Sequence, residues 1–272
     1  MKFKIVSVLK NVYRNIKYYR SILNNPKNLH LFFNPTEVPF VIINFNQLLY
    51  LKKLVDFAKK RGFKKIVIID NVSTYKPLLE YYESIKNEVT IEKMNQNYGH
   101  LVFFNNDEIY NKYGKSFFIL TDADIEPNDN LPVNFMRIFF KWLLRRDLSL
   151  TKVGFALDTE NIPQYYSERE KVLKWEKQFW ENEIEKNAYL ASIDTTFALY
   201  RPDPKKYFYT ESHFYRAVRL GGDFTCQHGG WFIDYDHLTD EQAFYINLAT
   251  SASSWIDTKR TQRDSPIETD SK

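Results

Sequence analysis

The sequence predicts an α/β fold in which helices flank a doubly wound, mostly parallel sheet, with a smaller subdomain beside it. Short apolar runs alternate with stretches of helical periodicity, and their spacing suits strand–helix–strand units. Acidic and amide residues follow several of these runs, and ligands bind where parallel strands end. The chain has 272 residues, 44% of them hydrophobic, so it can bury one sizeable core.

The first half of the chain alternates regularly between the two kinds of element. Apolar runs, typical of buried parallel strands, lie at residues 40–45, 65–69 and 116–120, and a further strand is predicted at residues 89–92. Helices are predicted between them, at residues 48–61, 77–85 and 106–113. Gly62 follows the first of these helices, as expected of a residue that ends a helix.

The second half is less regular. Its pattern predicts a strand at residues 152–157, a strongly charged helix at 167–186, a strand or hairpin at 189–200 and a helix at 238–248. Residues 220–231 contain half of the glycines in the chain, and they predict a loop that closes over a bound ligand.

We expect three regions along the chain. Residues 1–36 form a basic amphipathic helix and a connector, residues 37–256 a single domain, and residues 257–272 a polar, disordered tail. The domain has a nucleotide-binding half, residues 37–130, and an acceptor half, residues 131–256. The basic helix either lies on an anionic membrane surface or packs on its own domain with a solvated basic face.

Composition excludes several classes of protein. A net charge of +4 argues against a nucleic-acid-binding protein, and the single cysteine, Cys226, excludes an internal disulfide framework or a cysteine metal cluster. No apolar run approaches the roughly 20 residues of a membrane span. We therefore expect a cytoplasmic protein, with peripheral association at the inner face of the membrane if the basic helix binds there.

The strongest chemical signal is the acidic pair at the end of the fourth apolar run. Asp122 and Asp124 are spaced i and i+2 in the segment ILTDADIEP, where a strand would end. Two carboxylates there can hold a divalent cation, which in turn bridges a diphosphate. The alternative is a turn in which both carboxylates are solvated.

Further polar residues follow the other predicted strands. Asp70 ends the second strand, where it could accept hydrogen bonds from a nucleobase or a ribose, or serve as a turn residue. Asn97 and Gly99 lie in the next loop, and a glycine there allows a ligand to approach the backbone closely.

These segments together resemble a known family. In chain order, FVIINFNQ, IIDNVST, NQNYGH and ILTDADIEP are similar to the nucleotide-binding half of GT-A glycosyltransferases related to family 2, over about residues 38–130. The later segments DTTFALYRP and GGDFTCQHGGWF resemble bacterial glycosyltransferases of surface-polysaccharide synthesis. The resemblance implies a GT-A fold, a nucleoside-diphosphate sugar, with a UDP-sugar favoured, and Mn²⁺ or Mg²⁺. By position, Asp70 and Asn97 would contact the base or its loop, Asp122 the ribose or metal, and Asp124 the metal.

The acceptor half should supply a general base and contacts to the acceptor. Asp240 and Glu241 open a predicted helix, and they are candidate bases or, alternatively, part of an ordinary helix start. Asp234 and Asp236 compete for that role or contact the acceptor. His228 is a candidate third metal ligand. Trp231 could stack on an acceptor sugar or anchor the loop in the core, and Asp194 could face the donor sugar.

The function expected is transfer of a sugar from the nucleotide to a glycan or lipid-linked acceptor, with inversion, and the resemblance implies that the sugar is a hexose. A retaining transfer on the same fold stays open. A nucleotidyltransferase is a second candidate, although the segment after the first predicted strand, FNQLLYLKK, lacks the glycines that such enzymes use. A third is a catalytically inactive domain that only binds.

Overall fold

One mixed sheet organises the part of the chain that the structure describes. The computed structural model of the protein describes residues 24–145, 147–202 and 212–248, together with residue 20. The basic helix expected within residues 1–36 falls mostly outside these ranges, and the tail at residues 257–272 lies outside them entirely. Among the described residues, no helix has both the length and the apolarity that a membrane span needs.

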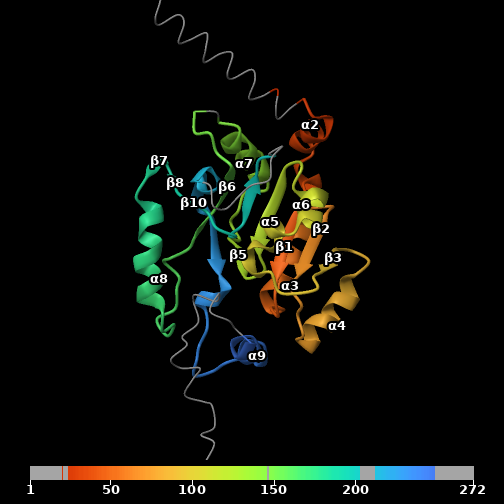
Figure 1. Ribbon diagram of the computed structural model, residues 1–272. Coiled ribbons are helices and arrows are strands. Elements are labelled where there is room, and N and C mark those ends of the chain that lie inside the picture. The colour runs from red at the N-terminus through yellow and green to blue at the C-terminus, as the bar shows by residue number, and fades with distance from the viewer. Residues whose placement is uncertain (1–19, 21–23, 146, 203–211, 249–272) are drawn as a thin grey trace, which may run out of the picture.

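The described strands form a 10-stranded sheet (Figure 1). Their order is β3-β2-β1-β4-β9-β6-β10-β8-β7, and β5 pairs with β10 beside this path. Neighbours β3, β2, β1 and β4 are parallel, β9 is antiparallel to both β4 and β6, and β6 is parallel to β10. The strands are β1 (Phe40–Asn44), β2 (Ile66–Asp70), β3 (Thr90–Lys93), β4 (Phe118–Asp122), β5 (Ile125–Pro127), β6 (Lys152–Leu157), β7 (Glu183–Glu185), β8 (Ala188–Leu190), β9 (Ala198–Tyr200) and β10 (Ala217–His228).

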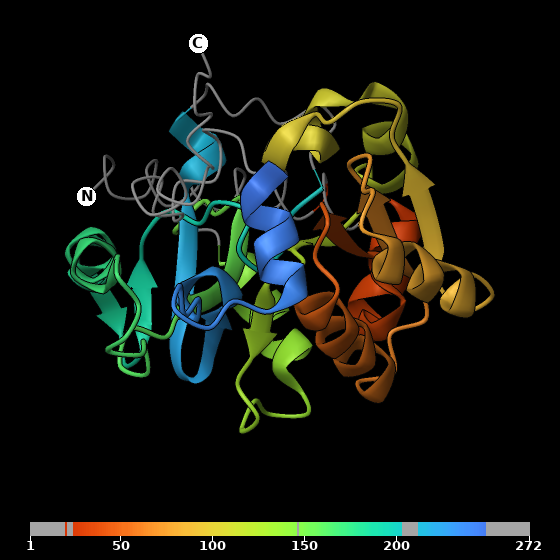
Figure 2. The same cartoon turned by 90° about the horizontal axis from the view of Figure 1, so that it is seen from below.

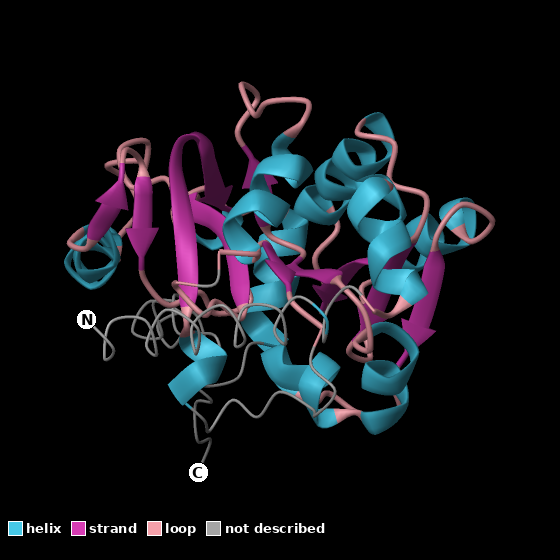
Figure 3. Ribbon diagram, turned by 90° about the horizontal axis from the view of Figure 1, so that it is seen from above, coloured by secondary structure: helices cyan, strands magenta, loops and turns pink. Residues whose placement is uncertain are grey.

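Helices cover both faces of this sheet (Figure 3). One face packs against residues of α3, α4, α7 and α8, and the other against residues of α5 and α6. The α/β fold with helices on both sides of a mostly parallel central sheet is thereby confirmed. The longer helices are α2 (Pro26–Phe33), α3 (Leu49–Lys60), α4 (Lys76–Ile85), α5 (Val102–Asn105), α6 (Asp107–Tyr113), α7 (Phe135–Leu143), α8 (Arg169–Glu176) and α9 (Asp240–Leu248).

Pairing of the central strands brings their carboxyl ends together. All five residues of β1 are buried, as are all five of β2, because helices lie on both faces. The register places Asn44 of β1 beside Asp70 of β2 and Ile43 beside Asp122 of β4. The polar residues that the sequence places after separate strands therefore share one edge of the sheet.

The glycine-rich segment differs from its prediction. Residues 220–231 were expected to form a loop, but most of them belong to β10, which pairs with β6, β5 and β8. The pairing with β6 skips residues 221–224, and Gly222 has a φ of 62° there. Two of the glycines therefore lie in an irregularity of a strand, where they relieve the strain of the turn.

Two other predictions also need correction. The connector contains the helix α2, which Asn25 caps by accepting a hydrogen bond from the backbone of Lys27. The charged helix expected at residues 167–186 is shorter, because α8 ends at Glu176 and passes into a 3₁₀ turn, Lys177–Trp180, and the strand β7.

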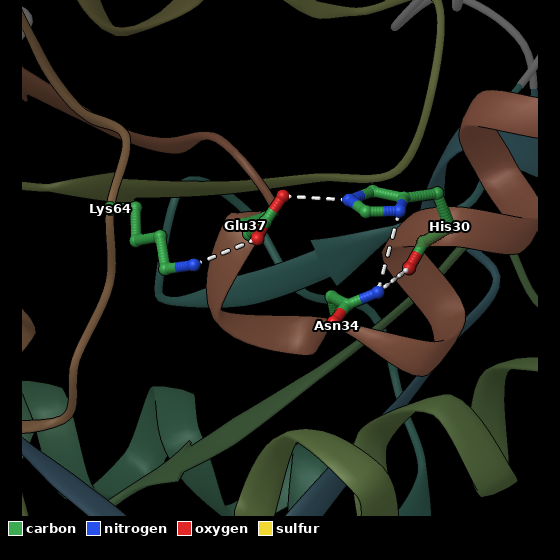
Figure 4. A network of polar contacts seen from close by, with 4 residues as sticks. All are labelled: His30, Asn34, Glu37 and Lys64. Carbon is green, nitrogen blue, oxygen red and sulfur yellow. Dashed lines mark hydrogen bonds and ion pairs between the residues drawn. The ribbon is translucent and has the colours of Figure 1, made fainter.

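A polar network holds α2 against the body of the domain (Figure 4). Glu37 accepts hydrogen bonds from His30 Nε2 at 2.7 Å and from Lys64 Nζ at 2.9 Å. These partners, the His30 bond first, lower the pKa of Glu37 to about 2. Asn34 donates to the carbonyl of His30 at 3.0 Å, and so the chain between α2 and β1 is fixed from both sides.

Candidate active site

Asp122 and Asp124 lie where β4 passes into β5, at the carboxyl edge of the sheet. The Asp122 N–H donates to the carbonyl of Thr195 at 2.9 Å, and the Thr195 hydroxyl donates to Asp122 Oδ2. Ala123, between the two acids, donates its N–H to the carbonyl of Ile43 in β1 at 2.9 Å. The turn that carries the acidic pair is therefore held by strand β1 on one side and by the segment before β9 on the other.

Asp124 is a buried residue, 9% exposed, yet one of its carboxylate oxygens is unsatisfied. Oδ1 has no hydrogen-bond partner among the described residues. Oδ2 lies 3.7 Å from Nδ1 of His228. A buried carboxylate oxygen without a donor is unfavourable by about 1–3 kcal/mol or more, so this atom is a candidate contact for a cation or for water.

The end of β10 brings His228 beside Asp124. His228 pairs with Ile125 across the β10–β5 ladder, and the N–H of Gly229 donates to the carbonyl of Asp124 at 2.7 Å. His228 Nδ1 accepts a hydrogen bond from the Gly230 N–H at 3.1 Å. That bond places the lone pair of a neutral imidazole at Nδ1, the nitrogen nearer to Asp124.

Tyr50 packs against the chain directly after His228. A Cβ atom at Gly229 would lie 2.3 Å from Cε2 of Tyr50, so the ring lies against the glycine backbone and leaves no room for a side chain there. Burial raises the pKa of Tyr50, as do the negative charges of Glu126 and Asp124. The Tyr50 hydroxyl is thus in electrostatic contact with the acidic turn.

The acidic pair has the donor chemistry of a partial metal site. Burial raises the pKa of Asp122 well above its usual value, and the charges of Asp124 and then Asp194 raise it further. Two carboxylates that repel each other in a buried turn are stabilised by a bound cation. Within the described ranges, no group of three or more His, Cys, Asp or Glu side chains is arranged to hold a metal by itself. Mg²⁺-type sites commonly use only one or two carboxylates and complete their shell with water and phosphate oxygens.

Asp70 is part of a buried network. It is 3% exposed, its Oδ1 accepts from the Tyr82 hydroxyl at 3.0 Å, and its Oδ2 accepts from the Ser73 N–H at 3.2 Å. Asn44 Nδ2 donates to the same tyrosine oxygen at 2.8 Å. Both carboxylate oxygens have internal partners, which fits the turn residue that the sequence offered as the alternative to a nucleotide contact.

The loop that contains Asn97 and Gly99 is organised by neighbouring amides. Asn97 Oδ1 accepts from the Gly99 N–H at 2.8 Å, and Gly99 has a φ of 71°, in the region that favours glycine. Asn71 Nδ2 donates to the Gly99 carbonyl at 3.0 Å. The exposed side chain of Asn97 and the open space beside Gly99 leave this loop accessible at the edge of the sheet.

Helix α9 lies beneath the carboxyl edge of the sheet (Figures 1 and 2). Glu241 accepts the N–H groups of Leu48 at 2.7 Å and Leu49 at 3.1 Å, which are otherwise unsatisfied at the start of α3. Rings of α9 contact the loops after β1 and β2, Tyr245 on Phe45 and Phe244 on Tyr75. Glu241 thus caps α3 across the fold, and its carboxylate oxygens are engaged there.

Asp240 lies at the start of a helix, as the sequence predicts. It is exposed there, and its negative charge, with that of Glu241, raises the pKa of Tyr75 after burial has done so. Tyr75 directly precedes α4. The role of Asp240 as a general base stays a prediction.

The remaining acceptor-side candidates are separated from one another. Trp231 is 0% exposed and its ring is stacked on His228 at 5.1 Å, so it supports the histidine from behind and offers no face to an acceptor. Asp234 accepts from the Asp236 N–H at 3.0 Å and pairs with His237 at 2.9 Å. Asp236 is exposed on the same loop. This loop precedes α9, and no contact joins Asp234 to Asp122 or Asp124.

Three residues of the site were not singled out by the sequence. Thr195 binds Asp122, Tyr50 fixes the end of β10, and Asn46 accepts the N–H groups of Thr74 and Tyr75 before α4. Asn46 has a φ of 52°, a conformation that asparagine tolerates better than most residues. Of these three residues, only Asn46 has a local sequence pattern that could have indicated its role, because it is an asparagine directly after a predicted buried strand.

Comparisons with known proteins were made for the whole chain. No protein-family model matches it, and no curated protein matches it. The chain is similar to a solved structure of the mannosyltransferase PcManGT from Pyrobaculum calidifontis in complex with GDP-Man and Mn²⁺, with 12% identity, a TM-score of 0.46, and coverage of 77% of this chain and 59% of that one. It is also similar to S. aureus TarS 1-349, at 14% identity and a TM-score of 0.41, and to the same protein with UDP, at 14% identity and a TM-score of 0.40. Both TarS matches cover 78% of this chain and 66% of that one, so the chain spans less than two thirds of the length of each of these structures.

Proposed function

We propose that the protein is a metal-dependent GT-A-type glycosyltransferase that takes a nucleoside-diphosphate sugar as donor. The observation that carries this proposal is the buried Asp124 oxygen without a partner, in an acidic turn at the carboxyl edge of a parallel sheet. This is the edge at which α/β proteins bind ligands. The order of the motifs along residues 38–130, which resembles these transferases, points to the same reaction.

Asp122, Asp124 and His228 would hold the cation. The two carboxylates offer oxygen ligands. His228 Nδ1 lies 3.7 Å from Asp124 Oδ2, and it would ligate the cation in exchange for the hydrogen bond that its single lone pair accepts from the Gly230 N–H. A cation bound there supplies positive charge against the diphosphate that leaves during transfer. The Gly229–Asp124 hydrogen bond and the Tyr50 ring keep the end of β10 in place, so that the histidine stays beside the acidic pair.

The nucleoside would lie along the edge formed by the ends of β1 and β2. Asn97 and Gly99 border this edge, and α9 lies across it (Figure 2). A UDP-sugar is the favoured donor and a glycan or lipid-linked saccharide the favoured acceptor, in the synthesis of a bacterial surface polysaccharide. The metal would be Mn²⁺ or Mg²⁺, whose preference for oxygen ligands suits the acidic pair.

The proposal is tested by binding of nucleotide sugars to the full chain. Thermal unfolding is followed with UDP-, GDP-, dTDP- and CMP-sugars, each with and without Mn²⁺. A ligand that binds only the folded state raises the midpoint by mass action. We expect one nucleotide to raise the midpoint only when Mn²⁺ is present, and we expect Asp124→Asn to abolish this shift and to lower turnover by about 100-fold or more.

Asp129→Asn is the matched control, because Asp129 is an exposed acid five residues after Asp124. It should keep both the shift and the turnover. A nucleotide shift without need of Mn²⁺ that survives Asp124→Asn would contradict the metal site. Metal-dependent binding with no sugar transfer or hydrolysis would favour the inactive binding domain.

A further inference from the structure

We propose that Asp194, in the segment between β8 and β9, is the general base of the transfer. The inference rests on the proposed function and assigns one of its steps to a residue. Asp194 is the exposed acid nearest along the chain to Thr195, which makes two hydrogen bonds to Asp122. Asp240 and Glu241, the two acids that the sequence offered as the base, open α9 as predicted, and the Glu241 carboxylate is engaged at the start of α3.

The backbone around Asp194 is fixed at several points. The N–H of Ala191 donates to Ala217 at 3.2 Å, and the carbonyl of Ser192 accepts from Arg219 Nε at 2.7 Å. The carbonyl of Asp194 itself accepts from the Tyr200 hydroxyl at 3.4 Å. A carboxylate on a rigid segment keeps its position relative to the acidic pair, which catalysis requires.

Close packing explains why this segment lies so near the sheet. Gly154 in β6 faces it, and a Cβ atom there would lie 2.2 Å from the carbonyl oxygen of Phe197 and 3.0 Å from Cδ1 of Ile193. Ile193 and Thr195 are buried, whereas Asp194 between them is exposed. Alternation of this kind anchors both neighbours in the domain and projects the Asp194 side chain outward.

The Asp194 carboxylate has no internal partner. Among the described residues no side chain forms a hydrogen bond or an ion pair with it, in contrast to the carboxylates of Asp70 and Asp234. Its negative charge reaches the acidic pair, because it contributes to the raised pKa of Asp122, after burial and Asp124. It also reaches Lys152 and Arg219 on the same side of the sheet.

The positive charge near Asp194 is itself held firmly. Arg219 is 4% exposed, donates to Glu176 Oε2 at 2.7 Å, and lies 3.9 Å from the centre of the Phe179 ring. This buried ion pair fixes the β10 residue that binds Ser192, and so it positions the segment of Asp194 indirectly. A buried pair of this kind specifies geometry more than it adds stability.

The step assigned to Asp194 moves one proton and exchanges one bond. The carboxylate takes the proton of the acceptor hydroxyl while the acceptor oxygen forms a bond to the anomeric carbon. The bond from that carbon to the diphosphate oxygen breaks, and its electron pair leaves with the nucleoside diphosphate. Attack opposite the leaving group gives inversion.

The test separates binding from turnover in Asp194→Asn. The probe is the nucleotide sugar that raises the unfolding midpoint of the wild type with Mn²⁺, and water serves as acceptor, with release of nucleoside diphosphate as the signal. We expect the dissociation constant and KM for the nucleotide sugar to stay within about threefold, and kcat to fall by about 100-fold or more. Asp129→Asn is the matched control, and Asp240→Asn tests the competing base.

Each outcome decides between assignments. The proposal would be overturned if Asp240→Asn lowered kcat while Asp194→Asn kept the kcat of the wild type. So would a loss of nucleotide-sugar affinity in Asp194→Asn that accounts for the whole fall in kcat/KM, because Asp194 would then bind the sugar and not the proton. If the wild type binds no nucleotide sugar, the proposed function itself fails. If the wild type binds and hydrolyses it and Asp194→Asn does so equally well, only the assignment of the base fails.

Discussion

Two acidic groups at the same edge of the sheet have opposite surroundings. At the end of β2, Asp70 accepts hydrogen bonds at both carboxylate oxygens, from Tyr82 and from the Ser73 N–H. At the end of β4, Asp124 is almost as buried, yet its Oδ1 has no partner among the described residues. Both aspartates follow an apolar strand, so the sequence around them looks alike.

The difference teaches how to tell a structural acid from a binding one. A buried carboxylate whose oxygens are satisfied stabilises the native state, and its removal leaves its partners unpaired. A buried carboxylate with an unsatisfied oxygen is unfavourable until a cation or a water binds it, so it is a candidate for binding. Substitutions at the two positions should therefore affect different quantities.

The largest expected effect on stability is that of Asp70→Ala. The substitution removes the acceptor of the buried Tyr82 hydroxyl and of the Ser73 N–H, and we expect it to lower the free energy of unfolding by about 3 kcal/mol. Asp124→Asn should leave the free energy of unfolding unchanged or slightly higher, because it removes a charge close to Asp122. Urea denaturation of both variants, with midpoint and slope compared, measures the difference.

The contrast would break down if Asp70→Ala unfolded at the wild-type midpoint but no longer bound a nucleotide. That result would restore the contact between Asp70 and the nucleotide that the sequence suggested. A loss of stability at Asp124→Asn equal to that at Asp70→Ala would show instead that the buried turn relies on the Asp124 charge.

Periodicity and apolar runs were sufficient for the fold class. Runs such as residues 40–45 and 65–69 form buried parallel strands, and the carboxyl-edge position of Asp122 and Asp124 follows from that order alone. The glycine-rich segment was misread because glycine marks both loops and irregular strands, and only pairing with β6 and β5 distinguishes them. Sheet pairing depends on residues far apart in the chain, and a local pattern does not contain it.

The roles of individual acids were less predictable than their positions. Glu241 looked like a helix-start acid or a base, but its carboxylate caps a helix almost two hundred residues earlier in the chain. Thr195 has no local pattern that distinguishes it from other threonines, although it binds Asp122. Such contacts are set by how α9 and the segment before β9 pack on the sheet, and therefore they require the tertiary structure.

A smaller effect is expected at Glu241, the acid that caps α3. Glu241→Ala leaves the N–H groups of Leu48 and Leu49 without their acceptor, and we expect it to lower the free energy of unfolding by about 1–2 kcal/mol. Glu241→Gln keeps an acceptor oxygen and should recover much of this loss. Asp240→Ala is the control, because Asp240 is exposed and does not bind Leu48 or Leu49. Chemical denaturation measures all three, and equal stability of Glu241→Ala and wild type would contradict the cap.

Lys152 is an intermediate case, a buried charge that is only partly satisfied. It is 0% exposed, donates to the Tyr200 hydroxyl at 3.2 Å, and lies 4.1 Å from the centre of the Phe214 ring. Burial lowers the pKa of Lys152 to about 7. The unfolded chain keeps its lysine protonated up to about pH 10, so between about pH 7 and pH 10 the unfolded state binds more protons than the folded state. The stability contributed by Lys152 should therefore rise with pH across this window, by at most about 1.4 kcal/mol per pH unit.

Lys152→Met isolates this dependence, since methionine fills a similar volume among the same rings and does not titrate. We expect Lys152→Met to be more stable than the wild type near pH 7, and the difference to shrink steadily as the pH approaches 10. Lys141→Met, at an exposed lysine, should show no such trend. Denaturant midpoints of the three proteins across this window provide the measurement.

A difference between Lys152→Met and wild type that does not change with pH would contradict the lowered pKa. It would mean that Lys152 stays protonated in the folded state, because the faces of Tyr200 and Phe214 stabilise its charge more than burial destabilises it. An aromatic face would then satisfy a buried charge as a hydrogen-bond partner does, and the distinction between Asp70 and Asp124 would have to include such faces.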